Sequence, residues 1–365
     1  MKRHNRLKKH TLGLAAALLM TAGMSQSALA GDSVYVNTSS LRYRTSAQIK
    51  DNNIAGNLSY GQKLERVGTS GQWTMILLNG KKYYVSSAYV TSKKPASAGA
   101  VQTTSQTAAG AQTSGGTAIA LSSNYKYANY SKINSGTATL YRSTASNKKN
   151  KVVCVNAGHG TNGGGSVKTQ CHPDGSAKVT GGTTGAGATS AVAVSSGMTF
   201  ADGTAESKVT LAMAKVLKTK LLNAGYDVLM IRESDDVQLD NIARTVIANN
   251  NADCHIALHW DSTSSNKGAF FMSVPSNATY RAMEPVASHW KQHNQLGESL
   301  ISGLKSAGVK IYSKGSMEMD LTQTSYSTIP SVDIELGDKA SDHSGATLET
   351  LANGLLTGVN TFFGQ

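Results

Sequence analysis

The chain has 365 residues, a formal net charge of +13, 36 glycines and only three cysteines. A domain usually holds roughly 100 to 200 residues, so this length predicts two folded units with connecting segments. Three cysteines exclude a small disulfide-stapled scaffold, and the lack of a sequence period excludes collagen and coiled coil. With 39% hydrophobic residues the chain can bury a core. The excess of basic residues is compatible with a nucleic-acid-binding protein, and the location of these residues along the chain tests that interpretation.

Residues 1–30 have the composition of an export signal. Five Lys and Arg residues precede an apolar stretch over residues 12–20, and Ala28-Leu29-Ala30 has the small-x-small pattern of a cleavage site. The apolar stretch is well short of the ~20 residues of a spanning helix, so an uncleaved membrane anchor is the less favoured alternative. We therefore expect a secreted protein without stable membrane insertion.

Residues 31–92 alternate short β-prone runs with turn signals, which predicts a small all-β barrel. Its ordered landmarks are Ser40-Leu41-Arg42-Tyr43-Arg44, Ile54-Ala55-Gly56-Asn57-Leu58, Gly71-x-Trp73 and Leu78-Asn79-Gly80-Lys81-x-Tyr83-Tyr84-Val85. With these landmarks the segment resembles the bacterial SH3-like domain. The resemblance implies a wall-binding or targeting module. A barrel that binds no ligand is the alternative, because a fold alone does not establish a function.

The next two segments connect this barrel to a larger region. Residues 93–120 consist mainly of Ala, Ser, Thr, Gly and Gln without a helical or strand period, which predicts a flexible linker. In residues 121–150 tyrosines return among polar residues, and we expect a lead-in segment that lies on the following domain.

From residue 151 to 365 predicted strands alternate with amphipathic helices. This pattern indicates an α/β domain with a mostly parallel sheet flanked by helices. We expect strands at 151–156, 226–231, 253–259, 268–274 and 331–336, and helices at 204–223, 237–249, within 280–307 and at 347–362. A Gly/Ser/Thr-rich insertion over residues 160–203 is much longer than the usual ~2 to 6 residues of a βα loop, so we expect it to be functional or mobile.

Two of the predicted strands run into a histidine, His159 and His259. Ligands of open α/β sheets collect at the carboxyl ends of strands, so these imidazoles are expected to meet. Glu206 opens the helix after the first strand and returns to the same edge. Two imidazoles and one carboxylate, with one position left for water, form a catalytic zinc set. Glu335, near the end of the last predicted strand, offers a second carboxylate as general base.

Five ordered pieces of this region carry a family resemblance. They are Asn156-Ala157-Gly158-His159-Gly160, Glu206-x-x-x-Thr210-Leu211-x-Met213-Ala214-x-x-Leu217, Leu239-x-x-x-x-Arg244-x-x-x-Ala248-Asn249, Ala252-Asp253-x-x-Ile256-x-Leu258-His259 and Ile329-Pro330-x-Val332-x-Ile334-Glu335-Leu336-Gly337. Residues 151–365 thereby resemble the type 3 N-acetylmuramoyl-L-alanine amidases, zinc enzymes that release the stem peptide from the glycan of bacterial peptidoglycan. The resemblance implies that His159, Glu206 and His259 bind Zn²⁺ and that Glu335 is the catalytic carboxylate.

The chain departs from the family pattern at three places. Asn156-Ala157 stands where the family more often has Asp-Pro, Trp260 follows the second histidine, and Asp338-Lys339 follows Glu335-Leu336-Gly337. These departures keep every proposed ligand and leave the shape of the substrate groove open. Arg244 is a possible contact for a carboxylate of the stem peptide, and a structural salt bridge with Asp240 is the favoured alternative.

Other candidate residues have plainer interpretations. His172 and Asp174 in the insertion are possible extra ligands, although a loop histidine is most often exposed to solvent. His289 and His293 have helical spacing but lack the adjacent glutamate of a zinc motif, so a solvated helix face is favoured. Cys154 and Cys254 are expected to be buried free thiols, and Cys171 in the insertion has no evident partner.

The expected activity is hydrolysis of the amide between the lactyl group of N-acetylmuramic acid and L-Ala, with zinc-activated water and Glu335 as the general base. The alternatives are a zinc peptidase or carboxypeptidase acting within the stem peptide, and a non-catalytic wall-binding protein. We expect a monomer that is secreted and associated with the cell wall, as an autolysin would be.

The charge is distributed unevenly along the chain. Residues 31–150 carry fourteen basic and three acidic residues, whereas residues 151–365 carry sixteen basic and nineteen acidic residues. The predicted catalytic region is therefore mildly acidic, which argues against nucleic acid as a partner. The basic half suits peptidoglycan and anionic cell-wall polymers as partners.

Overall fold

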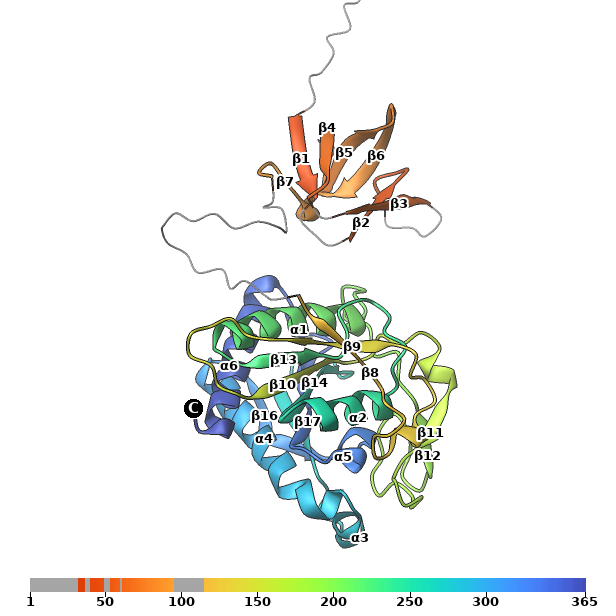
Figure 1. Cartoon of the computed structure of the whole chain (residues 1–365), viewed down its shortest axis with the longest axis vertical. Helices are drawn as coiled ribbons and strands as arrows, with labels where there is room; N and C mark the ends of the chain where they lie inside the picture. Colours follow the sequence, from red (N-terminus) through yellow and green to blue (C-terminus); the bar gives the residue numbers. More distant parts are fainter. Residues whose placement is uncertain (1–31, 37–39, 49–52, 60, 95–114) are drawn as a thin grey trace, which may run out of the picture. The chain divides into compact units, whose positions relative to one another are not determined.

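The computed structural model describes residues 32–36, 40–48, 53–59, 61–94 and 115–365. The predicted export signal and most of the predicted linker lie outside these residues. The chain divides into two compact units, with the division at residue 107, and Figure 1 draws both. Among the described helices, none is long and apolar enough to cross a membrane.

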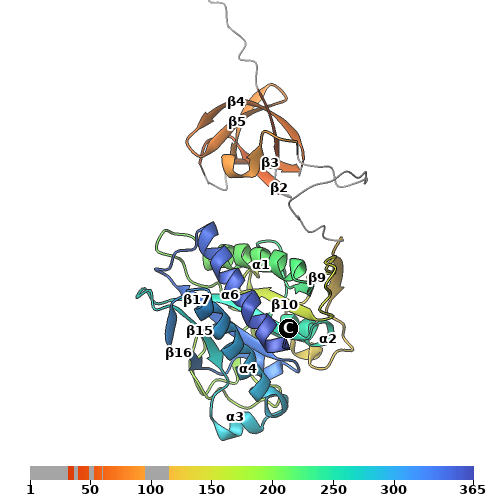
Figure 2. The ribbon, with the colours of Figure 1, turned by 90° about the vertical axis from the view of Figure 1, so that its left-hand side faces the viewer.

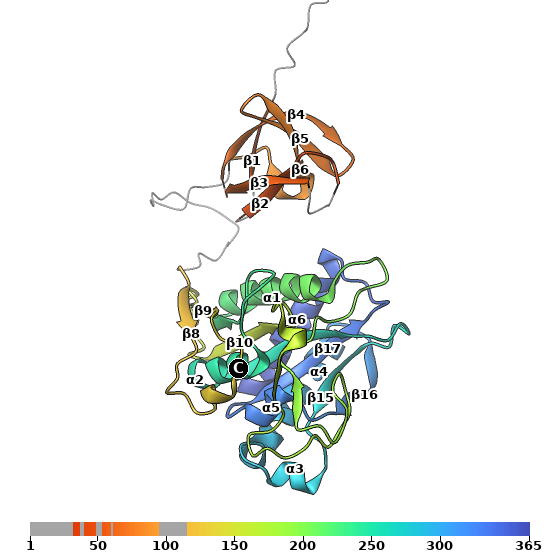
Figure 3. The same ribbon diagram turned by 90° about the vertical axis from the view of Figure 1, so that its right-hand side faces the viewer.

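The N-terminal unit is all-β, as the sequence predicts. Every strand pairing in it is antiparallel, and Figure 3 shows the strands curling around a common centre. A two-residue turn at Asn79 and Gly80, both with positive φ, joins two of the strands. The strand order is β3-β2-β6-β5-β4-β1-β7, with β1 (Asp32–Val36), β2 (Ser40–Arg44), β3 (Ile54–Ser59), β4 (Lys63–Ser70), β5 (Trp73–Leu78), β6 (Lys81–Ser86) and β7 (Val90–Thr91).

The C-terminal unit contains an eight-stranded mixed sheet of order β16-β15-β17-β14-β10-β13-β9-β8. Its centre is parallel and consists of β13 (Asp227–Met230), β10 (Val152–Ala157), β14 (Cys254–Asp261) and β17 (Ser331–Asp338). On one side β15 (Ala269–Ser273) runs antiparallel to β17 and parallel to β16 (Ile311–Glu318). Four of the seven strand pairings are parallel, as expected of a mostly parallel sheet, and the sheet is mixed because β15 pairs antiparallel with β17 and β9 pairs antiparallel with β13 and β8.

The other edge of the sheet comes from residues that the sequence did not assign to strands. β8 (Thr117–Ala120) pairs antiparallel with β9 (Thr137–Tyr141), and β9 pairs antiparallel with β13. β8 lies inside the predicted linker and β9 inside the predicted lead-in segment. The lead-in thus belongs to the fold of the C-terminal unit, because its strand covers the edge of β13.

Helices cover both faces of this sheet. On one face α1 (Glu206–Asn223), α4 (Val286–Ser306) and α6 (Gly345–Phe363) pack over a large apolar core, and Figure 2 shows these three helices together. On the other face lie α2 (Asn241–Asn251) and the short α5 (Thr322–Tyr326), seen in Figure 3. A further short helix, α3 (Ala278–Ala282), precedes α4.

Strand alternation divides the residues of β14 and β17 between the two faces. Ile256, Leu258 and Ile334 point into the core under α1, α4 and α6. His259 and Glu335 therefore point to the opposite face, where α2 lies. This division places His259 and Glu335 on the same side of the sheet.

The insertion over residues 160–203 has its own structure. It contains a 3-10 turn, η4 (Gly164–Ser166), and an antiparallel pair, β11 (Lys168–Gln170) and β12 (Ser190–Val192). Buried Asp320, which follows β16, accepts hydrogen bonds from Lys178 Nζ at 2.8 Å and Thr180 Oγ1 at 2.5 Å. His172 is also buried, with Nε2 3.2 Å from Asp320. The expectation of an exposed loop histidine is therefore wrong.

Candidate active site

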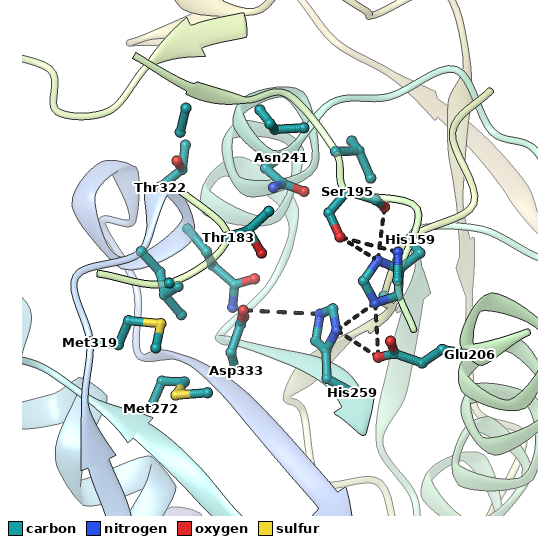
Figure 4. A pocket seen from close by; sticks show the side chains of 18 of the residues that line it. His159, Thr183, Ser195, Glu206, Asn241, His259, Met272, Met319, Thr322 and Asp333 are labelled. Atoms are coloured by element: carbon teal, nitrogen blue, oxygen red, sulfur yellow. Dashed lines mark hydrogen bonds and ion pairs between the residues drawn. The ribbon is translucent and has the colours of Figure 1, made fainter. Parts of the chain in front are cut away.

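The three residues predicted as zinc ligands meet at the carboxyl edge of the sheet. His159 Nε2 lies 2.8 Å from Glu206 Oε1, and His259 Nδ1 lies 3.2 Å from the same oxygen. The two ring nitrogens are 3.0 Å apart. One donor atom from each residue lies within 4.8 Å of the others, and Figure 4 shows the three side chains converging. We call these residues the triad.

Two buried arginines hold the turn that presents His159 after β10. Arg232 donates to the carbonyl oxygens of Ala157 and Gly158 at 3.0 and 2.8 Å. Arg244 donates to the carbonyl oxygen of His159 at 2.7 Å. His159 itself has a φ of 64°, a left-handed conformation that a non-glycine residue adopts only where its surroundings enforce it. The arginines supply that enforcement.

Two glycines make room for the triad. A Cβ at Gly158 would lie 2.3 Å from Cε1 of His259. Gly197, with a φ of +80°, passes so close that a Cβ there would lie 2.8 Å from both Glu206 Oε2 and the His159 ring. Any larger residue at either position would displace a triad side chain.

Hydrogen bonds fix the orientation of the triad side chains. His159 Nδ1 lies 2.8 Å from the carbonyl oxygen of Ser195, to which it can only donate, so Nε2 carries the lone pair toward Glu206 and His259. Glu206 Oε2 accepts from the backbone N–H of Met198 at 2.8 Å, and Oε1 accepts from that of Trp260 at 3.0 Å. This tautomer of His159 is the one that can bind a metal through Nε2.

Burial and mutual interactions shift the pKa values of all three triad residues. Burial raises the pKa of Glu206, but its interactions with the two histidines outweigh burial and hold the pKa well below its usual range. Burial likewise opposes ionisation of His259, but the hydrogen bond to Glu206 and the charge of Asp333 raise its pKa to about 9. The pKa of His159 is lowered, mainly by burial. Without a metal, His259 therefore holds a proton at neutral pH.

Two carboxylates of β17 lie on the same face as His259. The register pairs Ala257 with Asp333 and His259 with Glu335. Glu335 Oε2 and Asp333 Oδ1 are buried and, among the described residues, have no hydrogen-bond partner. Burial raises the pKa of Glu335 to about 8 and raises that of Asp333.

Asp333 was not among the residues predicted for the site. Its Oδ2 lies 4.0 Å from Nε2 of His259, on the ring edge that faces away from Glu206. The signal was present, because strand alternation places residues 333 and 335 on one face. Ser195 had no such signal, since it lies in the insertion.

The triad, Asp333 and Glu335 line one pocket of about 550 Å³. One wall comes from the insertion, including Thr183 and Ser195. The end away from the triad carries Met272 and Met319, and in Figure 4 Asp333 lies between these methionines and His259. The pocket therefore has a polar end at the triad and an apolar end.

Arg244 lines the pocket as well, but its surroundings differ from those expected. It is 1% exposed and does not lie on a polar helix face. Its five N–H groups donate to Leu239 O, Asn156 Oδ1, Ala157 O, His159 O and Thr161 Oγ1. Asp240, the expected ion-pair partner, caps α2 instead. Arg244 thus holds the turn of His159.

The remaining candidates lie away from the triad. His293 is buried and accepts from the backbone N–H of Ser331 at 2.9 Å, so the predicted solvated face is wrong for this residue. Asp174 is exposed and bonds within its own turn to Ser176. The three cysteines are free and buried, as predicted for Cys154 and Cys254.

Comparison with known proteins identifies the family of the chain. The model of the N-acetylmuramoyl-L-alanine amidase family (Amidase_3) matches residues 153–353, more than half of the chain. The chain belongs to this family. No curated protein sequence matches the chain.

The solved structures that match the chain are amidases of low sequence identity, with TM-scores below 0.5. Ami1 from Mycobacterium smegmatis has 18% identity and a TM-score of 0.49 over 60% of this chain and 99% of its own. An N-acetylmuramoyl-L-alanine amidase from Clostridium difficile 630 has 16% identity and a TM-score of 0.42, over 59% and 97%. The CwlD amidase from Clostridioides difficile, solved with the GerS lipoprotein, has 17% identity and a TM-score of 0.40, over 59% and 99%.

Proposed function

We propose that this amidase is zinc-dependent and hydrolyses the amide between the lactyl group of N-acetylmuramic acid and L-Ala of the stem peptide, with Glu335 as the general base. The observation that carries the proposal is the convergence of His159, Glu206 and His259 within 4.8 Å on the wall of a pocket. Membership of the amidase family supports the substrate class, and the donor set supports the metal chemistry.

The donor set fits zinc. Two imidazole nitrogens and one carboxylate oxygen are a common set of protein ligands at catalytic zinc sites. The lone pair of His159 Nε2 already points at the other donors, and Gly158 and Gly197 leave no bulk against the triad. When bound there, the ion would polarise the scissile carbonyl and lower the pKa of water from 15.7 to about 7.

Glu335 can move the proton during hydrolysis. It lies beside His259 across the strands and lines the same pocket. As the water oxygen attacks the carbonyl carbon, a Glu335 carboxylate oxygen would accept the water proton and pass it to the leaving L-Ala nitrogen. Burial raises the pKa of Glu335, so its ionised carboxylate is a stronger base for the first step than an exposed one.

Product analysis tests the proposal. Purified wall digested by the full chain with zinc should yield an intact glycan and stem peptides with a free L-Ala amino group, read by mass spectrometry. E335Q should lower kcat by roughly 10²- to 10⁴-fold while the zinc content stays unchanged. New amino termini elsewhere would establish the peptidase alternative, and wall binding without products would establish the non-catalytic one.

We also propose that residues 31–92 are an SH3-like wall-binding domain of a secreted protein, with residues 1–30 as the export signal. The support is the all-β fold of the described strands and the basic charge of this half of the chain. Binding of residues 31–150 to purified wall should weaken steeply with salt, whereas hydrolysis of soluble muropeptides by residues 115–365 should not. Equal salt sensitivity would contradict this division.

A further inference from the structure

Three carboxamide side chains line the pocket beside the triad, those of Asn156, Asn241 and Gln323. A carboxamide donates and accepts hydrogen bonds without a net charge, so it can pair with an amide group of a substrate. It does not titrate, and its donors and acceptor are the same with and without the proposed ion. A carboxamide that has no partner within the protein is the one that is free to bind a substrate.

Two of the three carboxamides hold parts of the protein together. Asn156 accepts a hydrogen bond from Nη1 of Arg244 at 3.1 Å. Gln323 donates to Ser331 Oγ at 3.0 Å and to the carbonyl oxygen of Val332 at 3.1 Å, and both bonds are buried. Turning either side chain toward a substrate would break a buried hydrogen bond, which is costly.

The side chain of Asn241 differs, because it has no hydrogen-bond partner among the residues that the structure describes. Asn241 is partly exposed, and Figure 4 shows its amide directed into the pocket. A molecule in the pocket can therefore reach this amide. A substrate group that both donates and accepts can replace the water that otherwise satisfies it.

The backbone holds Asn241 in a fixed position. It is the first residue of α2, and its N–H donates to the carbonyl oxygen of Ala193 in the insertion at 3.1 Å. Its carbonyl oxygen accepts from Thr245 Oγ1 at 2.8 Å. Asp240 caps the helix by accepting from the N–H of Ala243 at 2.8 Å, so the helix does not need the Asn241 side chain as a cap. The side chain thus stands on a rigid support and remains available to another partner.

We propose that Asn241 is a substrate-binding residue that pairs with a secondary amide of the substrate. The inference rests on the proposed function and adds to it a residue that recognises the substrate. The proposed substrate has secondary amides in three places: in the stem peptide beyond L-Ala, in the N-acetyl group of the sugar, and at the scissile bond. An amide that enters the pocket loses its water, and the Asn241 side chain supplies one acceptor and one donor in exchange.

Substitution of Asn241 by alanine tests the proposal. Alanine is the better helix former, so N241A should keep the unfolding midpoint and the zinc content of the natural chain. With the zinc-loaded full chain and N-acetylmuramoyl-tetrapeptide, we expect KM to rise about three- to tenfold while kcat stays within about twofold. Calorimetry with E335Q, and with E335Q that also carries N241A, should show the same loss of affinity for this substrate.

N250A is the matched control. Asn250 belongs to the same helix but does not line the pocket, and its side chain donates to the carbonyl oxygen of Val246 at 2.7 Å. The same substitution at this position should leave KM and kcat unchanged. An equal rise of KM in both variants would be a general effect of α2 and would overturn the proposal.

Two shortened substrates identify which amide is bound. N-acetylmuramoyl-L-alanine lacks the amides beyond L-Ala, and muramoyl-tetrapeptide without the acetyl group lacks the amide on the sugar. The loss of affinity caused by N241A should disappear for the substrate that lacks the amide bound by Asn241. A loss that persists with both substrates assigns the contact to the scissile amide.

The outcomes distinguish this inference from the proposed function. Unchanged KM and affinity in N241A overturn the role of Asn241 and leave the amidase activity standing. A fall in the stability or zinc content of N241A overturns it too, because the side chain would then have a structural role. Cleavage of none of the substrates by the natural chain overturns the amidase proposal and this inference together.

Discussion

The two faces of the C-terminal sheet use the same two strands for different purposes. Toward α1, α4 and α6, β14 and β17 present Leu258 and Ile334 to an apolar core. Toward α2 and the insertion, they present His259, Asp333 and Glu335, whose pKa values are all raised. We call these the core face and the site face. Hydrophobic burial on one face stabilises a sheet that carries destabilising polar groups on the other.

Substitutions at two neighbouring residues of β14 should show the largest difference between the two faces. His259→Ala on the site face removes one of three proposed donor atoms, so we expect zinc affinity to fall by at least about 100-fold and amidase activity to fall to background. The measurement is metal analysis after dialysis, together with the wall-digestion assay. Zinc retained at the original affinity would contradict the ligand assignment.

Leu258→Ala, one residue earlier on the core face, should act on stability alone. Leu258 is fully buried, so the truncation should lower the free energy of unfolding by about 2 to 5 kcal/mol. Denaturant unfolding measures this loss. Activity per folded molecule and zinc content should stay near those of the natural chain, and Leu258→Met should recover most of the stability. A loss of zinc in Leu258→Ala would show that the faces are coupled.

Glu335→Gln should show that the site face lowers stability. The pKa of Glu335 is raised from 4.5 to about 8 in the folded, metal-free protein. Because the folded-state pKa of Glu335 is raised, the stability of the folded protein is highest below pH 4.5 and falls as the pH rises to 8. Glutamine does not ionise, so the variant has no such loss. Metal-free E335Q should therefore gain stability over the natural chain as the pH rises from 4 to 9, on the order of 5 kcal/mol.

Thermal unfolding of both metal-free proteins across this pH range gives the measurement. A natural chain that is equally or more stable than E335Q at pH 9 would contradict the burial of an unpartnered carboxylate. Asp261→Asn is the control, because Asp261 already has an ion-pair partner and its pKa is lowered.

Zinc binding should depend on pH through His259. Its pKa of about 9 in the metal-free protein means that a proton must leave before Nδ1 can bind the ion. Apparent affinity should thus rise roughly tenfold per pH unit, or about 100-fold from pH 6 to pH 8. Competition with a chelator and the count of released protons check this, and a flat profile would mean that His259 is neutral.

The triad could be predicted from sequence because each member stands at the end of a predicted strand or at the start of a predicted helix. His159 and His259 follow strands with apolar periodicity, and Glu206 opens a helix that returns to the same edge of the sheet. The structure brings all three together. Glu335 also lies where alternation on its strand predicts. The roles of these residues remain proposals.

The rest of the site depends on contacts between distant segments. Asp320 binds Lys178 and Thr180, some 140 residues earlier, and no local pattern links them. The sequence places Arg244 on the polar side of its helix. Only the folded turn of His159 supplies the oxygen atoms that allow this arginine to be buried. The edge strand β8 was missed because a segment of only four residues, Thr117–Ala120, becomes a strand only when β9 is beside it.

The triad residues lie far apart in the sequence, so the site is complete only late in folding. Its members come from the end of β10, the start of α1 and the end of β14, so 100 residues separate the first from the last. A chain that has folded only as far as α1 holds two of the three donor atoms. If these residues bind the metal as proposed, metal loading requires the folded sheet centre, and a partly folded chain holds an incomplete site.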